Sequence, residues 1–215
     1  MWDVTARTQC WVSHAHPTRT NHVVWSPDGT RLASGSEDGS LYVWDASDGT
    51  LLQTLQGHHG MVASVVWSPD GTRLASSGGS RGSGEVFLWD AHSEAHGGQL
   101  LHTFTDSPGS VFAVEWSKRG ELLVSGSSDG MLRWWDVQNG KCVRVREAHQ
   151  GAIQSLRISP DGRRLASCGD DGAIQVWNLD SGELLRTLRR DRPYERLNIT
   201  GVQGLTEAQQ ATLRL

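Results

Sequence analysis

The chain has 215 residues, 37% of them hydrophobic and 20% charged, which is the composition of a folded protein with one sizeable core. Its formal charge of −4 offers no electrostatic basis for binding nucleic acid or an anionic membrane. No run of residues approaches the roughly 18 apolar ones that a membrane-spanning helix needs, and the N-terminus lacks the charged and apolar regions of a signal peptide.

Three cysteines, Cys10, Cys142 and Cys168, are too few and too scattered for a disulfide framework. We therefore expect reduced thiols and a cytoplasmic location. The sequence contains no phosphate-binding loop of the Gly-Lys-Ser/Thr kind, and we expect no cofactor.

Five tryptophans recur at a nearly constant spacing and set the organisation of the chain. The intervals between them are 42, 45, 46 and 42 residues; the first four are followed by Asp and the last by Asn. A period of about 40 to 45 residues that ends in Trp-Asp is typical of a four-stranded propeller blade. These tryptophans are Trp2, Trp44, Trp89, Trp135 and Trp177. The sequence therefore predicts an all-β propeller.

Residues 1–12 begin inside a repeat. Trp2 and Asp3 correspond to the end of a third strand, and residues 9–12 to the fourth strand of the same blade. We therefore expect a partial blade over residues 1–12, followed by four complete blades over residues 13–189.

In the first complete repeat, short apolar stretches alternate with tight turns. Pro27 presets φ, the Asp28 side chain can bond its own backbone, and Gly29 accepts a positive φ. The pair Asp38-Gly39 is a second hairpin signal. The strands predicted in the four repeats are 22–25, 31–34, 41–44 and 51–55; 62–67, 73–76, 86–89 and 100–104; 111–116, 122–125, 132–135 and 142–145; and 153–158, 164–167, 174–177 and 184–188.

This repeated pattern resembles the WD-repeat family of β-propellers over about 190 of the 215 residues. The chain is similar to the C-terminal part of bacterial multidomain WD-repeat proteins. In that family a His before the first strand, a Ser on the second, an Asp in the next turn and the Trp of the third form one hydrogen-bonded set, which supplies partners for buried polar groups. The implied sets are His16, Ser34, Asp38 and Trp44; His58, Ser76 and Trp89; Ser125, Asp129 and Trp135; and His149, Ser167, Asp171 and Trp177.

Two of these sets are incomplete in the sequence. In the second repeat the turn is lengthened to SGGSRGSGE, and Ser83 or Gly84 stands where the family has Asp. In the third repeat Ser107 replaces the His. We therefore expect the second and third blades to be less stable than the others. In the first repeat His14 and His22 are alternatives to His16.

Four blades are at the lower limit for a closed propeller, so an open arc is expected. An arc exposes two apolar flanks, which a monomer rarely tolerates. We therefore expect this chain to be the C-terminal part of a longer propeller. The alternative is self-association into a closed ring.

The pattern changes after Leu188. Residues 189–193 are charged and end in Pro193, as a linker does. Thr206 and Gln209 have the spacing of a capping box, and apolar residues follow at roughly helical spacing. We therefore expect a tail over residues 190–215 that contains a short helix.

The sequence offers only weak candidates for metal-binding, catalytic or base-stacking residues. The pair His58-His59 and the histidines of the first repeat have no Cys or carboxylate at metal-ligand spacing, so we expect no metal site. The Asp and Ser residues of the implied sets occupy equivalent positions in separate repeats, which favours structural roles over acid-base or nucleophilic ones. Trp25, Trp67 and Trp116 are expected to pack between blades, because no basic groove accompanies them for base stacking.

The remaining function is recognition by loops on a rigid scaffold. We expect a non-enzymatic scaffold or sensing module that binds a protein or peptide, with no nucleic acid or membrane partner. The alternative is an assembly element that closes a ring with another copy or with absent upstream blades. An enzyme would require titratable side chains that converge at the channel mouth. The loop candidates for partner binding are Arg19, Glu37, His59, Met61, Arg81, Ser110, Ser128, Ala152 and Asp170.

Overall fold

The computed structural model describes residues 1–215 except 4, 6, 14, 81, 92–97 and 190–215. The expected C-terminal helix lies outside the described residues. The described chain forms four four-stranded antiparallel sheets and one two-stranded sheet, as expected for an all-β propeller. Its strands are β1 (Trp2–Asp3) and β2 (Thr8–Gln9); β3 (Thr20–Trp25), β4 (Arg31–Ser36), β5 (Leu41–Asp45) and β6 (Leu51–Leu55); β7 (Met61–Trp67), β8 (Arg73–Ser80), β9 (Ser83–Asp90) and β10 (Leu100–Ser107); β11 (Val111–Trp116), β12 (Leu122–Ser127), β13 (Met131–Asp136) and β14 (Cys142–Glu147); and β15 (Ile153–Ile158), β16 (Arg164–Gly169), β17 (Ile174–Asn178) and β18 (Leu184–Leu188).

Within each sheet the strands are hydrogen-bonded in sequence order, so each repeat is one sheet.

The turn between β3 and β4 shows how short side chains allow neighbouring strands to pair as a hairpin. The Ser26 hydroxyl donates to Asp28 at 2.6 Å, the Thr30 amide donates to the same carboxylate at 3.0 Å, and Gly29 has φ of 73°. These hydrogen bonds lower the pKa of Asp28 to about 2. An ionised Asp and a glycine therefore close this hairpin.

One turn differs from its prediction. The stretch SGGSRGSGE was expected to be a lengthened turn, but β8 extends to Ser80 and β9 begins at Ser83, and these two residues pair directly. The extra residues therefore lengthen the strands of the second sheet. Gly79, at φ of 119°, adopts a conformation that an L side chain rarely takes.

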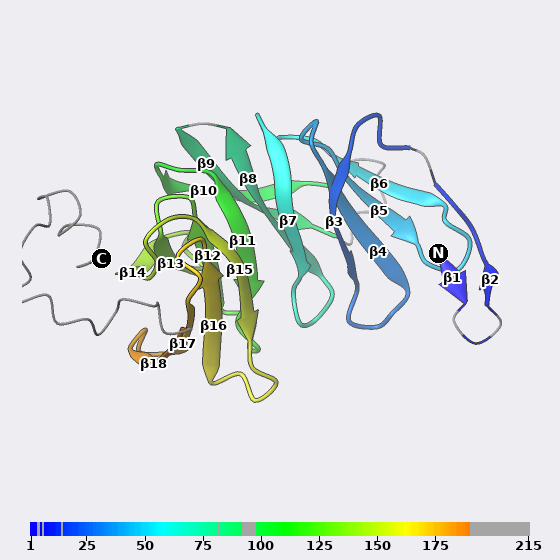
Figure 1. The fold of residues 1–215 in the computed structure, drawn as a ribbon. Coiled ribbons are helices and arrows are strands. Elements are labelled where there is room, and N and C mark those ends of the chain that lie inside the picture. Colours follow the sequence, from blue (N-terminus) through cyan, green and yellow to red (C-terminus); the bar gives the residue numbers. More distant parts are fainter. Residues whose placement is uncertain (4, 6, 14, 81, 92–97, 190–215) are drawn as a thin grey trace, which may run out of the picture.

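The four sheets lie side by side in an arc, with β3, β7, β11 and β15 as the inner strands (Figure 1). A separate apolar core fills each of the three junctions between neighbouring sheets. Val43 and Leu74 lie in the first core, Ala75 and Leu123 in the second, and Leu165 in the third. Each sheet therefore buries its apolar faces against its neighbours, as blades do.

Both ends of the arc expose apolar side chains, as predicted for an open arc of blades. Val23 and Trp25 on β3 are 60% and 49% exposed, and Ile174 on β17 is 46% exposed. Among the described residues no helix is long and apolar enough to cross a membrane.

Candidate functional site

The fourth sheet contains the complete hydrogen-bonded set. The Trp177 indole donates to the Ser167 hydroxyl at 3.1 Å, and the same hydroxyl lies 2.8 Å from His149 Nε2. His149 Nδ1 lies 2.9 Å from Asp171. Because an indole only donates, the Ser167 oxygen accepts from Trp177. One buried serine therefore connects the third strand to the loop before the first.

In the first sheet His16, rather than its alternatives, takes this place. His16 Nε2 lies 2.7 Å from the Ser34 hydroxyl, to which Trp44 donates at 2.8 Å. His16 reaches Asp38 through Ser40, which donates to the carboxylate at 2.6 Å. His22 lies on β3 and accepts the Val65 amide, and His14 lies outside the described residues.

The second sheet completes its set with a residue that the sequence analysis missed. His58 Nε2 lies 2.7 Å from Ser76, and Trp89 donates to the same hydroxyl at 2.8 Å. The carboxylate is Glu85, 2.9 Å from His58 Nδ1. The expectation that Ser83 or Gly84 fills this position is wrong, because the longer strands place the acid on β9. The available signal was that Glu85 is the one acidic residue between Ser76 and Trp89.

The third sheet has no histidine at this position, and its Asp is bound by other side chains. Trp135 still donates to Ser125 at 2.8 Å, but Asp129 is bound by Arg133, at 2.6 Å, and by the Ser127 hydroxyl. Ser107, which stands where His was expected, donates to the Gly109 carbonyl instead. The second set is therefore complete, against expectation, whereas the third lacks its histidine as the sequence predicted. The lower stability expected for these two blades stays a prediction.

Arg133 occupies the strand position that carries an aromatic residue in the first two sheets. There Tyr42 stacks on His16 with ring centroids 4.2 Å apart, and Phe87 stacks on His58 at 4.3 Å. Without a histidine to stack on, this position is free for a cation. Arg133 is buried and its charge is matched by Asp129.

The sets support one surface, which we call the loop face: the turns after the second strands and the segments before the first strands. In three sheets a backbone amide of that turn donates to that segment, from Glu37, Ser128 and Asp170. In the second sheet the segment is bound by a side chain, because Glu85 accepts from the His59 amide at 3.1 Å. In every sheet, therefore, hydrogen bonds hold the two parts of the loop face together.

The loop candidates have different surroundings on this face. Arg19 and Glu37 form an exposed ion pair at 3.6 Å, His59 contacts Glu85 at 2.7 Å, and Gln154 donates to Asp170 at 2.8 Å. The remaining candidates add apolar and hydroxyl groups. Met61 is half-buried, Ser128 is exposed, Ala152 is buried, the Ser110 hydroxyl donates to the Ser80 carbonyl, and Arg81 lies outside the described residues.

Titratable side chains also converge at the inner strands. His22, Glu115 and Arg157, from three different sheets, line one pocket of about 280 Å³. Arg157 lies 3.6 Å from Glu115, and His22 already accepts a backbone amide. The pocket lining contains no Ser or Cys nucleophile. Among the described residues no three His, Cys, Asp or Glu side chains form a possible metal site.

Burial controls protonation in the second set. Burial lowers the pKa of His58, although the hydrogen bond and charge of Glu85 oppose this. Burial raises the pKa of Glu85, but hydrogen bonds from His59 and His58 outweigh it and leave the pKa lowered. The set therefore contains a neutral histidine and an ionised glutamate at neutral pH.

Replacing Ser76 with Ala should cost more stability than replacing Ser125 with Ala. Ser76 partners both a buried Trp and a buried His, whereas Ser125 partners only Trp135. At about 1 to 3 kcal/mol for each buried group left unpaired, Ser76→Ala should lower the free energy of unfolding by about 2 to 6 kcal/mol and Ser125→Ala by about 1 to 3 kcal/mol. Urea denaturation measures both; equal losses would contradict this assignment.

Stability should fall as the pH is lowered from about 7 to 5. The folded-state pKa values of His16, His22 and His58 lie below the usual histidine value of 6.5, and burial is the largest cause for each. Between 6.5 and those lower values the unfolded chain binds protons that the folded chain does not, so the free energy of unfolding declines with pH. Urea denaturation at pH 7.5 and 5.5 tests this, and His58→Asn should reduce the difference. An unchanged midpoint would rule it out.

Comparisons with known proteins agree with this geometry. A family model described as the IFT122 first beta-propeller matches residues 19–193. The chain is 34% identical over 150 residues to nuclear distribution protein PAC1 of Arthroderma otae, covering 66% of this chain and 32% of that protein. It is 32% identical over 132 residues to nuclear distribution protein nudF of Aspergillus niger, covering 61% and 29%.

A plant protein is also similar. The chain is 26% identical over 133 residues to autophagy-related protein 16 of Arabidopsis thaliana, covering 61% of this chain and 25% of that protein. The alignments thus span less than a third of these relatives. All three are eukaryotic, so they give no support to the expected bacterial origin. With a family match over residues 19–193, the chain belongs to the WD-repeat β-propellers, in the family of the IFT122 first propeller.

Proposed function

We propose that this protein is a non-catalytic interaction module that binds a peptide or protein segment on its loop face. The observation that carries the proposal is that hydrogen bonds hold that face in every sheet, through a Ser–His pair in three sheets and through Arg133 and Asp129 in the third sheet. Ser–Trp hydrogen bonds fix Ser34, Ser76, Ser125 and Ser167 to the third strand of each sheet. A surface held in this way binds with little loss of conformational freedom.

The side chains offered to a partner are mixed in charge. Arg19, Glu37 and Asp170 are exposed, with Met61 half-buried beside them. A stable contact needs a total buried area of roughly 1,200 Å² or more, so a partner must span several sheets. The carboxylates inside the sets are occupied by hydrogen bonds, which favours recognition over acid-base chemistry.

The open ends of the arc favour a second candidate function, assembly with further polypeptide. Val23 and Trp25 at one end and Ile174 at the other are exposed, although equivalent positions in the inner sheets are buried. The cytoplasmic location stays a prediction.

A matched pair of double variants tests the loop face. Glu37→Arg with Asp170→Arg changes two exposed acids of that face, and Glu121→Arg with Asp180→Arg makes the same charge change in turns at the opposite strand ends. A library of displayed peptides is selected on the wild-type chain. The selected peptides should bind the first variant at least about tenfold more weakly, a loss of about 1.4 kcal/mol, and the second unchanged. Equal binding to both variants would refute the proposal.

A further inference from the structure

The first sheet has one face that points away from the second sheet, and half of that face has no neighbouring sheet. Val23 is 60% exposed, whereas the equivalent residues of the next three sheets, Val65, Val114 and Leu156, are 0%, 1% and 1% exposed. In those sheets this position is covered by the preceding sheet. The first sheet therefore carries the side chains of a blade junction without the preceding blade's inner strands.

The other half of this face is covered by the pair β1–β2 and the segment that follows it. The Trp11 indole donates to the Ala46 carbonyl at 3.1 Å, and Met1 and Trp11 pack on Trp44. The equivalent carbonyl in the fourth sheet, that of Leu179, accepts from Trp134 of the preceding sheet at 3.0 Å. The β1–β2 pair thus takes the place of the two outer strands of a blade.

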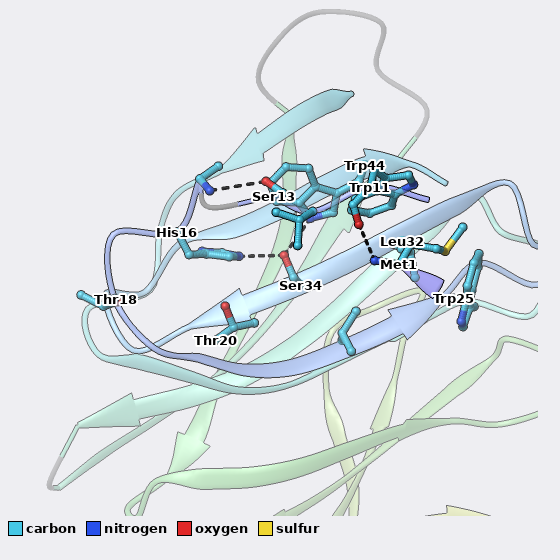
Figure 2. Close-up of a pocket in the computed structure, with 13 residues that line it drawn as sticks. Met1, Trp11, Ser13, His16, Thr18, Thr20, Trp25, Leu32, Ser34 and Trp44 are labelled. Atoms are coloured by element: carbon cyan, nitrogen blue, oxygen red, sulfur yellow. Dashed lines mark hydrogen bonds between the residues drawn. The ribbon is translucent and has the colours of Figure 1, made fainter. Parts of the chain in front are cut away.

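A hollow of about 780 Å³ lies between these two parts, and Figure 2 shows its lining. Met1 and Trp11 of the N-terminal segment and Val23, Trp25 and Leu32 of the first sheet supply its apolar lining. Among the described residues β1 pairs only with β2, so the opposite edge of β1 is available for a further strand. The hollow combines an apolar floor with a free strand edge.

We propose that this hollow is the docking site of a two-stranded β-hairpin supplied by a partner polypeptide. One strand of the hairpin pairs with the free edge of β1, and the other covers Val23 and Trp25. The three intact junctions define its chemistry, because the second strand of the preceding blade presents a small aliphatic residue to the next blade: Ala33, Ala75 or Val124. The mode is strand addition combined with side-chain burial.

A second copy of this chain fits the hollow poorly. Its open end is the fourth sheet, with Ile174 exposed, and that sheet brings four strands. The two outer strands would meet the place that Trp11 already occupies against Ala46 and Gly49. The hollow therefore suits two strands and not four. This inference rests on the second candidate function and is independent of the loop face.

A fluorescein-labelled peptide of residues 111–127 is the probe, because this hairpin presents Val124 to a junction of the same kind. Its anisotropy is titrated with the intact chain and with two variants. Val23→Asp changes the floor of the hollow, and Ile174→Asp makes a matched change at the other end of the arc. Saturable binding to the wild-type chain and to Ile174→Asp, weakened at least about tenfold in Val23→Asp, is expected. Photo-crosslinking of the peptide to residues 20–25 locates the site without any variant.

Three outcomes overturn the proposal. The first is the absence of saturable binding to the wild-type chain. The second is self-association of the chain that Val23→Asp and Ile174→Asp weaken equally, because a second copy would then be the occupant. The third is peptide binding only after removal of residues 190–215, which would make that segment the occupant. None of these outcomes changes the peptide binding expected of the loop-face variants.

Discussion

Each four-stranded sheet of this protein has two apolar faces and can bury them only against a neighbouring sheet. This constraint explains the three cores, which are shared between consecutive sheets. It also explains why identical strand positions are buried in the middle of the arc and exposed at its ends, as Val65 and Val23 show. Stability therefore arises between repeats, and each repeat contributes a face on either side.

Within a sheet, one serine hydroxyl connects two requirements. It gives a buried indole N–H an acceptor. In three sheets it also lies within hydrogen-bond distance of a histidine in the preceding loop. The acid that completes the set differs: Asp38 acts through Ser40, Glu85 acts from a strand, and Asp171 acts directly. The Ser–Trp hydrogen bond is thus common to all four sheets, while the partners of the acid and the outward side chains differ from sheet to sheet.

The strands and the Ser–Trp pairs were predictable from the sequence because both depend on local spacing: the Trp period, the Pro-Asp-Gly turns and a serine ten residues before the Trp in three repeats. Glu85 and Arg133 were not. The role of Glu85 depends on how far β8 and β9 extend, and that of Arg133 on a missing histidine in another loop. Both are consequences of side chains meeting through space, which repeat register alone does not encode.

Hydrogen–deuterium exchange of the intact chain tests most directly the claim that sheets are stabilised by their neighbours. The second and third sheets, buried on both faces, should exchange the amides of β8, β9 and β12 most slowly. The amides of β3 and β17, at the open ends, should exchange measurably faster. Equal protection of all four sheets would contradict the account, because it would mean that the two end faces are covered in solution.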